Sequence, residues 1–282
     1  VRGSRDDFRP VPTTRHGHMM GENRENRMRS FHSFLLFTGL TLCGMQPVYA
    51  GSASNISKSL ANSSRSEADR ERDARDRPQD VLELAGFKKG MVIADVFGGS
   101  GYYSEILSRV VGPKGRVLLL NNAPYDNYAK KDLGPRFADG RLPNVEYKVV
   151  PNESLGLAEN SLDGALIVMS YHDLFYADPE NGWPAIDSRQ FMGQIVAGLK
   201  PGGRLLIVDH SAKDGTGRSD AQKLHRIEEQ YALAQLKSYG LDWVGSIAVL
   251  RNPADDRSLG VFDPAIKGKT DRFVHVYQKP EN

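Results

Sequence analysis

The side chains best suited to acid–base chemistry stand at two points where an apolar run ends. The first run is followed by Tyr171, His172 and Asp173, and the second by Asp209 and His210. An imidazole titrates near neutral pH and can act as a general base, while a neighbouring carboxylate can orient it. We therefore predict a catalytic group of Tyr171, His172, Asp173 and His210, with either histidine as the base. The alternative is that these groups cap strand ends and bind water.

A third histidine, His225, raises the possibility of a metal site. Glu228 and Glu229 follow it at helical spacing, so the three histidines and nearby carboxylates could hold an ion. The spacing matches no strong metal-binding motif, and the single cysteine, Cys43, stands in the N-terminal segment. We therefore predict no bound metal, and keep a metal-assisted enzyme as a weaker alternative.

A glycine-rich turn forms the second candidate site. Asp95 ends a short apolar run, and Gly98, Gly99 and Gly101 follow it at the start of a helical pattern. Glycines there let backbone N–H groups approach a ligand with no Cβ in the way. The third glycine of a dinucleotide fingerprint is absent, because Ser104 stands at its position, and no Walker lysine follows. The turn therefore disfavours nicotinamide and nucleoside triphosphate sites.

The elements that must position these residues alternate along the chain. Apolar runs predict strands at 91–96, 116–120, 145–150, 162–170, 204–209, 243–250 and 272–278. Helical spacing and a capping box predict helices at 102–111, 125–137, 188–199 and 219–239. We therefore predict an α/β fold with a doubly wound, Rossmann-like seven-stranded sheet, mostly parallel and ending in an antiparallel hairpin. The long loop inside that hairpin is either a solvated excursion, which we favour, or a substrate lid.

The N-terminal segment differs from the rest. Residues 28–50 have a basic start, an apolar run shorter than the roughly 20 residues of a membrane span, and a small-residue site before Gly51. We predict a cleaved signal peptide there and a periplasmic or secreted protein; a buried apolar helix is the alternative. Residues 1–27 are then an upstream extension without structure of its own.

The remaining chain divides into a linker and a domain. Residues 51–74 are rich in Ser and Asn and then in charge, and predict a linker that leads into a helix. Residues 75–282 form the folded domain. The net charge of +2 on 282 residues gives no electrostatic footprint for nucleic acid, so we predict a small-molecule substrate and no nucleic-acid partner. No stable membrane insertion is expected after signal removal, and the sequence does not indicate the oligomeric state.

Together these motifs resemble those of the class I S-adenosylmethionine-dependent methyltransferases. The resemblance covers residues 75–280 and rests on the strings 92–101, 160–163 and 199–204. More narrowly, the chain resembles an exported bacterial group of such proteins, through the strings 98–103, 171–173, 209–210, 224–227, 261–264 and 270–273. The resemblance implies S-adenosylmethionine as the cofactor and methyl transfer to an unidentified small molecule.

The resemblance also implies which residues hold the cofactor, besides Asp95 and the glycines. Asn121 stands where the family has an acid for the ribose hydroxyls, Asn152 and Glu153 stand where the adenine amine is read, and Ser170 lies beside the methyl group. Phe97 replaces the usual first glycine. Because an amide lacks the charge-assisted hydrogen bonds of an acid, we expect weaker or differently shaped cofactor binding.

Export adds a second functional hypothesis. S-adenosylmethionine is made in the cytoplasm, so an exported protein with Asn121 in place of the acid could hold a small ligand without transferring a methyl group. We therefore carry an exported, non-catalytic binding protein of the same fold as the alternative to the methyltransferase.

Overall fold

The computed structural model describes residues 50–281. The predictions for residues 1–49, which include Cys43 and nearly all of the signal peptide at 28–50, lie outside the described residues. Within residues 50–281, no helix combines the length and apolar character needed to cross a membrane.

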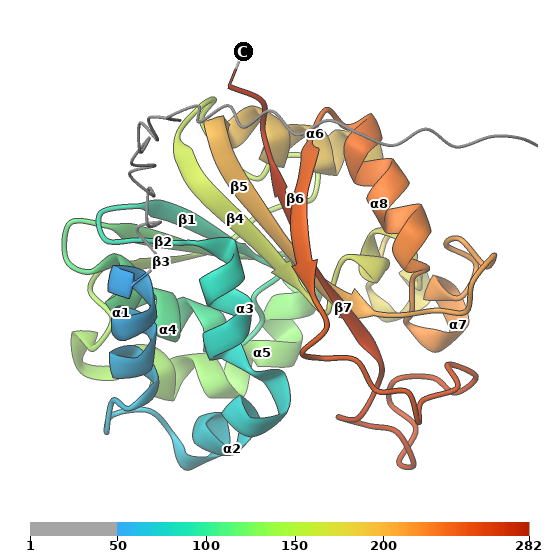
Figure 1. The fold of residues 1–282 in the computed structure, drawn as a ribbon, viewed down its shortest axis with the longest axis horizontal. Helices are drawn as coiled ribbons and strands as arrows, with labels where there is room; N and C mark the ends of the chain where they lie inside the picture. The colour runs from blue at the N-terminus through green and yellow to red at the C-terminus, as the bar shows by residue number, and fades with distance from the viewer. Residues whose placement is uncertain (1–49, 282) are drawn as a thin grey trace, which may run out of the picture. The chain divides into compact units, whose positions relative to one another are not determined.

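A seven-stranded sheet forms the centre of the fold (Figure 1). Its strands are β1 (Val92–Val96), β2 (Arg116–Asn121), β3 (Val145–Val149), β4 (Leu162–Val168), β5 (Leu199–His210), β6 (Asp242–Ile247) and β7 (Arg272–Gln278). They lie in the order β3-β2-β1-β4-β5-β7-β6. The first five are parallel, and β7 runs antiparallel to both β5 and β6. The predicted seven-stranded sheet with its antiparallel C-terminal pair is confirmed.

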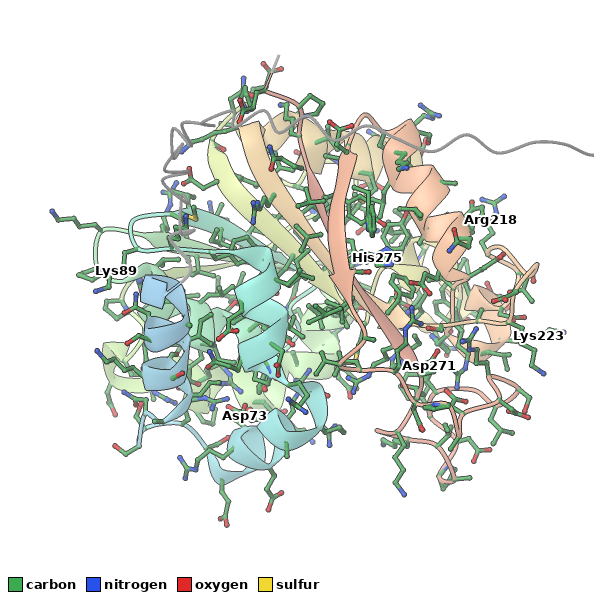
Figure 2. All side chains as sticks on the ribbon, viewed as in Figure 1. Asp73, Lys89, Arg218, Lys223, Asp271 and His275 are labelled. Carbon is green, nitrogen blue, oxygen red and sulfur yellow. The ribbon has the colours of Figure 1, made fainter. Side chains whose placement is uncertain are left out.

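Helices cover both faces of the sheet. They are α1 (Ala50–Leu60), α2 (Glu67–Asp76), α3 (Pro78–Ala85), α4 (Tyr102–Val111), α5 (Ala123–Phe137), α6 (Ser188–Gly198), α7 (Ala221–Leu224) and α8 (Glu229–Ser238). Successive strand residues face opposite ways, so Ile93 packs with the α1, α3 and α4 side chains and Ala94 with those of α6 and α8. Figure 2 labels His275 of β7, whose Nε2 lies 2.8 Å from Oε1 of Glu229 and ties α8 to the sheet.

The segment predicted as a linker is helical, which corrects the expected domain boundary. Helix α1 places Ile56 fully inside an apolar cluster with α3 and α4. The Ser59 hydroxyl donates to the Ile106 carbonyl of α4 over 2.8 Å. Although Ser and Asn dominate this stretch, Ile56 and Leu60 are four residues apart and form one apolar stripe that α4 covers. The folded unit therefore includes residues from about 50 onward, rather than from 75.

The helix predicted at 219–239 is also corrected, because two helices form there. Its expected capping box is absent, since Ser219 and Gln222 bind backbone groups of Thr216 and Ala177 instead. The chain turns at His225, which has a positive φ of 53°, and Ile227 then forms a parallel bridge with Ser211. These tertiary contacts outweigh local helix propensity. His225 consequently does not share a helix face with the two glutamates that follow it.

Candidate active site

A cavity of about 500 Å³ opens at the carboxyl edge of the parallel strands. Its wall combines the loop after β1, the segment after β4, the end of β5, and parts of α2, α5 and the β6–β7 loop. Among the predicted site residues, those that line it are Gly98, Gly99, His172, Asp173 and His210. The sheet order reverses between β1 and β4, which is where doubly wound folds bind ligands.

The glycine loop is shaped by contact with Asp95 beneath it. A Cβ on Gly98 would come within 2.6 Å of the Asp95 carboxyl, so no larger residue fits there. At Gly99, φ is +58° and a Cβ would meet no atom within 4 Å. Asp95 is buried and accepts a hydrogen bond from the Ser104 hydroxyl over 2.7 Å. Burial raises the pKa of Asp95 to about 6, so a proton or a nearby cation is needed to offset its charge.

Asn121 does not reach the cavity as predicted. Its side-chain oxygen accepts from the Gly99 N–H over 3.0 Å, and its amide nitrogen donates to the Gly99 carbonyl over 2.9 Å. The side chain is fully buried and braces the glycine loop from below. An amide can satisfy both backbone groups because it has a donor and an acceptor side by side. The predicted contact with a ribose is therefore replaced by a contact with the loop itself.

Four other predicted cofactor contacts also lie outside the cavity lining. Asn152 is buried and accepts from the amide of Asn122 over 3.0 Å, while Glu153 is exposed. The Ser170 hydroxyl is buried and lies 3.4 Å from the Val168 carbonyl. Gly101, with a φ of +80°, packs on buried side chains where α4 begins. None of these four residues lines the cavity, and Glu153 faces solvent.

His172 is held between two carboxylates. Its Nδ1 lies 2.8 Å from Oδ1 of Asp209, and its backbone N–H donates to the other Asp209 oxygen over 2.7 Å. Its Nε2 lies 3.3 Å from Oδ1 of Asp173. Burial alone would lower the pKa of His172, but the two carboxylates outweigh burial and raise that pKa to about 9. In this state the ring is a cation that donates hydrogen bonds at neutral pH, which does not suit the predicted base.

His210 has the opposite electrostatic environment. Its Nδ1 lies 2.7 Å from the Thr270 hydroxyl, and its backbone N–H donates to Asp209 over 2.7 Å. Burial, reinforced by the His172 cation, lowers the pKa of His210 well below its ordinary value. The ring is therefore neutral. When Nδ1 donates to Thr270, Nε2 is the nitrogen left to accept a proton from a ligand in the cavity.

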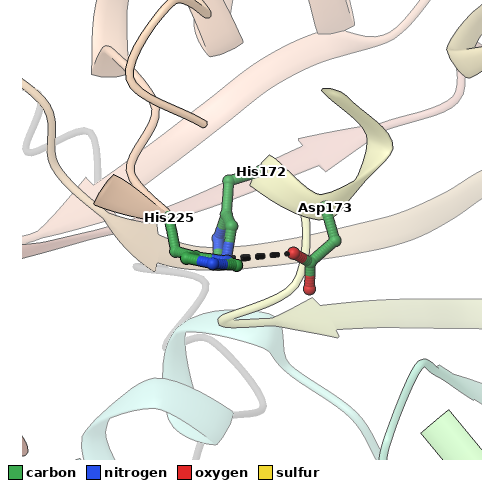
Figure 3. Close-up of side chains that lie close together, drawn as sticks. All are labelled: His172, Asp173 and His225. Carbon is green, nitrogen blue, oxygen red and sulfur yellow. Dashed lines mark ion pairs between the residues drawn. The ribbon is translucent and has the colours of Figure 1, made fainter. Parts of the chain in front are cut away.

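Asp173 contacts His172, Tyr125 of α5 and His225. The Tyr125 hydroxyl donates to one Asp173 oxygen, and Nδ1 of His225 lies 3.5 Å from the other. Burial would raise the pKa of Asp173, but the imidazoles of His172 and His225 outweigh it and lower that pKa. Figure 3 shows His225 and Asp173 approaching one another beside His172.

Tyr171, predicted as catalytic, lies elsewhere. Its hydroxyl donates to Gln235 of α8 over 2.7 Å, and its ring is buried in the apolar layer under α6 and α8. The short 3₁₀ turn His172–Phe175 directs consecutive side chains to different sides, so Tyr171 points into the core while His172 lines the cavity.

Several residues that line the cavity were not predicted from the sequence. Arg72 of α2 lines the cavity, where it lies over the Tyr102 ring at 4.0 Å and pairs with Asp76 at 2.6 Å. Tyr125 of α5 stacks on Phe97 with ring centres 4.7 Å apart. At neither position does the sequence alone distinguish a residue that lines a cavity from one that packs in the interior.

The β6–β7 loop does reach the cavity. It supplies Val261 and Phe262, whose ring centre lies 5.0 Å from that of His225. Buried Asp255 anchors the loop through two hydrogen bonds from Arg226, at 2.9 and 3.1 Å. Phe262 of this loop is exposed at the cavity rim.

Backbone strain concentrates in this cavity. Seven non-glycine residues in the described part of the chain have a positive φ, and three of them, Phe97, Met169 and His225, line it. Left-handed backbone costs a side-chain-bearing residue about 1–3 kcal/mol and persists where surrounding structure enforces it. Its clustering around one cavity marks that cavity as the functional site.

The chain is similar in sequence to known methyltransferases over part of its length. No protein-family model matches the chain. The ubiquinone/menaquinone biosynthesis C-methyltransferase UbiE of Pseudomonas putida strain GB-1 is 30% identical over 131 residues, 46% of each protein. UbiE of Klebsiella pneumoniae strain 342 is 28% identical over 130 residues, covering 46% of this chain and 47% of that protein. The chain spans about half the length of the curated relatives it matches.

Solved structures match over more of the chain. A SAM-dependent methyltransferase from Aquifex aeolicus has a TM-score of 0.52 and 21% identity, covering 80% of this chain and 97% of its own. The cyclase SpnF has a TM-score of 0.52 and 16% identity, covering 79% of this chain and 86% of its own. The protein therefore has the Rossmann-like fold of the class I S-adenosylmethionine-dependent methyltransferases.

Proposed function

We propose that the protein is an S-adenosylmethionine-dependent methyltransferase acting on a small molecule. One observation carries this proposal: the glycine loop after β1 and the histidines at the ends of β4 and β5 line one strained cavity. The fold is that of enzymes with this activity, and the sequence relatives are named methyltransferases. The acceptor is a small organic molecule, because the cavity of about 500 Å³ holds a ligand and not a macromolecular surface.

The residues around the cavity fit the cofactor in part. Gly98 and Gly99 present bare backbone to the cavity, as a loop that approaches a ligand closely must. Phe97 and Tyr125 provide a stacked aromatic wall beside it. The cofactor supplies an electrophilic methyl group on a sulfonium. The acidic residue that binds the ribose hydroxyls in the family has no counterpart in the cavity lining. The shape of the cavity and aromatic stacking therefore hold the nucleoside in place of a charged hydrogen bond.

The chain's own residues would position the acceptor and receive its proton. In the transfer, a bond forms between an acceptor atom and the methyl carbon while the carbon–sulfur bond breaks, which leaves a neutral thioether. The acceptor loses a proton, and Nε2 of His210 is placed to take it. The aromatic rings of Tyr176 and Trp183 also line the cavity, and the Trp183 ring packs edge-on against Tyr125 with ring centres 5.5 Å apart.

The second candidate is a binding protein of the same fold that transfers no methyl group. Asn121 favours it, because both polar groups of its side chain are used by Gly99 and none is left for a ribose. The similarity of SpnF, a cyclase, shows that this fold also carries other activities.

Calorimetry with S-adenosylmethionine and S-adenosylhomocysteine separates the two candidates when combined with a methylation assay on a panel of metabolites. The methyltransferase predicts binding of both ligands and turnover of at least one acceptor. Binding without turnover favours the binding protein. Absence of binding at millimolar ligand rejects the methyltransferase.

A matched pair of glycine variants ties any binding to this cavity. Gly99→Ala and Gly90→Ala both place a side chain at a positive φ in open space, but only Gly99 lines the cavity. Gly99→Ala should weaken S-adenosylhomocysteine binding about tenfold or more, while Gly90→Ala should leave it unchanged. Equal effects of the two changes would place the ligand elsewhere.

We also propose that the protein is exported, as in the bacterial group it resembles. The basic start, short apolar run and small-residue site of residues 28–50 support this. A reporter enzyme that is active only outside the cytoplasm, fused after the last residue, should be active; inactivity with full expression would reject export.

A further inference from the structure

Three side chains of metal-binding type converge on one point of the cavity wall. They are His172, Asp173 and His225, and each offers one ligand atom within 4.8 Å of the other two. Nε2 of His172 lies 3.3 Å from Oδ1 of Asp173, and Nδ1 of His225 lies 3.5 Å from the same oxygen. Figure 3 shows the three side chains reaching this point from two different segments of the chain.

The spacing of these atoms suits a single bound ion. Two ligand atoms that each lie about 2.1 Å from an ion and are 3.3 to 3.5 Å apart subtend an angle of about 105–115°. That angle is close to the tetrahedral value. Two imidazoles and one carboxylate form a donor set that zinc and ferrous iron both accept, with further coordination positions left open. Binding releases the proton that Nε2 of His172 carries in the metal-free protein.

Each of the three side chains is also oriented by an outer partner. The second ring nitrogen of His172 is bound to the Asp209 carboxylate, and the second oxygen of Asp173 accepts from the Tyr125 hydroxyl. The His225 ring packs against Tyr176, with ring centres 4.7 Å apart. A carboxylate behind a ligating histidine fixes its tautomer and directs the free nitrogen to the metal, and this arrangement recurs in metal sites.

The backbone at His225 supplies an independent observation. A helix is expected through this residue, yet the chain breaks there and adopts a strained φ of 53°. The break places the His225 ring next to the 3₁₀ turn that carries His172 and Asp173. The bridge between Ile227 and Ser211 enforces this strained backbone and so holds the His225 ring at that position.

We propose that His172, Asp173 and His225 bind a divalent transition-metal ion of the zinc or ferrous class. Its open positions face the cavity, where a hydroxyl or carboxylate oxygen of a bound molecule can complete the coordination. An ion there acts as a Lewis acid that lowers the pKa of a coordinated hydroxyl. The metal site stands independently of methyl transfer, and only this role toward the acceptor rests on the proposed function.

The test uses the full chain, stripped of metal with a chelator, and two probes. Titration with Zn²⁺ in a calorimeter gives stoichiometry and affinity, and Co²⁺ gives visible absorption bands that report the geometry of its ligands. We expect one tight Zn²⁺ site with a Kd of about 1 μM or lower, and Co²⁺ bands of four- or five-coordinate intensity. Because His16, His18 and His32 also belong to the chain, the site is read as the difference between parent and variants.

The variants separate ligands from neighbours. Asp173→Asn and His225→Gln should each weaken Zn²⁺ binding about 100-fold or more and remove the Co²⁺ bands, since each takes away one ligand. His210→Gln is the matched control: its ring centre lies 5.8 Å from that of His172 in the same cavity, but it offers no atom to the cluster. Its Zn²⁺ affinity should match the parent's, and thermal unfolding should confirm that all three variants are folded.

Two results would overturn the metal site. One is Zn²⁺ binding in the parent no tighter than in Asp173→Asn and His225→Gln. The other is an equal loss in His210→Gln. Both titrations are carried out without S-adenosylmethionine or acceptor, so their failure leaves the methyl-transfer proposal intact, and the failure of methyl transfer leaves the metal result intact.

Discussion

Asn121 and Gly99 form a closed pair of hydrogen bonds, in which the amide side chain accepts from the glycine N–H and donates to the glycine carbonyl. The two residues are 22 positions apart, at the ends of neighbouring strands. The pair fixes the glycine loop before any ligand arrives. It also makes the asparagine, which departs from the acid typical of the family, a structural requirement of this particular loop.

Replacing this amide by an acid should destabilise the protein. In Asn121→Asp, a carboxylate would face the Gly99 carbonyl with no proton to donate, so we expect unfolding free energy to fall by about 2 kcal/mol. Asn160→Asp is the control, because Asn160 is exposed and its side-chain oxygen accepts a hydrogen bond from Lys279 over 3.0 Å, which a carboxylate also accepts. Urea unfolding measures both. An Asn121→Asp variant with parental stability and tighter S-adenosylmethionine binding would contradict the observed pairing.

Asp95 should make stability depend on pH. Its pKa is raised from 3.8 to about 6 in the folded protein, so the folded state binds the proton more tightly than the unfolded chain. The resulting stabilisation is fully present below about pH 4 and is lost as the pH rises through about 6. Asp95→Asn keeps an oxygen for Ser104 and has no charge, so its stability relative to the parent should rise by up to about 3 kcal/mol between pH 4 and pH 7.

Thermal unfolding of parent and Asp95→Asn across this pH range provides the measurement. The difference between the two curves isolates Asp95 from the other acids that titrate in the same range. A difference that stays constant with pH would show that Asp95 has an ordinary pKa.

The ion pair between Arg226 and Asp255 should show strong energetic coupling. Every guanidinium nitrogen of Arg226 is buried and donates, either to Asp255 or to backbone carbonyls. Asp255→Asn leaves that cation without its carboxylate, and we expect a loss of about 3–5 kcal/mol. Arg226→Met combined with Asp255→Asn should lose less than the sum of the single changes. Additive losses in urea unfolding would contradict a buried, coupled pair.

Helix α1 should contribute directly to the stability of the domain. Ile56 is fully buried between α3 and α4, so Ile56→Ala should lower the unfolding free energy by about 2–4 kcal/mol. Lys58→Ala, on the exposed side of the same helix, should change it by less than about 0.5 kcal/mol. Equal and negligible effects of both changes would restore the interpretation of this stretch as a linker.

The seven-stranded, mostly parallel sheet and the strand ends that carry the candidate residues could be predicted because they follow from strong local patterns. Apolar runs such as 162–168 give buried strands, and their polar successors must meet at one edge of a parallel sheet. His172, Asp173 and His210 were found in this way. The glycine loop was predicted because its glycines directly follow an apolar run that ends in Asp95.

The remainder depends on contacts between distant parts of the chain. The direction of the Asn121 side chain is set by the Gly99 backbone, and the break at His225 is set by the bridge from Ile227 to Ser211. Neither partner is near in sequence. Tyr171 was predicted to belong to the site because it directly precedes His172. The 3₁₀ turn that begins there directs the Tyr171 side chain toward Gln235 and away from the cavity, and sequence spacing does not reveal that turn.

The hydrogen bond of 2.9 Å between Arg272 of β7 and Asp76 of α2 joins residues 196 positions apart, both buried. A contact of this span can form only after nearly all of the domain has been synthesised. Until β7 inserts between β5 and β6, Asp76 lacks that cation and has Arg72 and Arg75 of its own helix as partners. The floor of the cavity, which includes Arg72, is therefore among the last parts of the domain to reach its final geometry during folding.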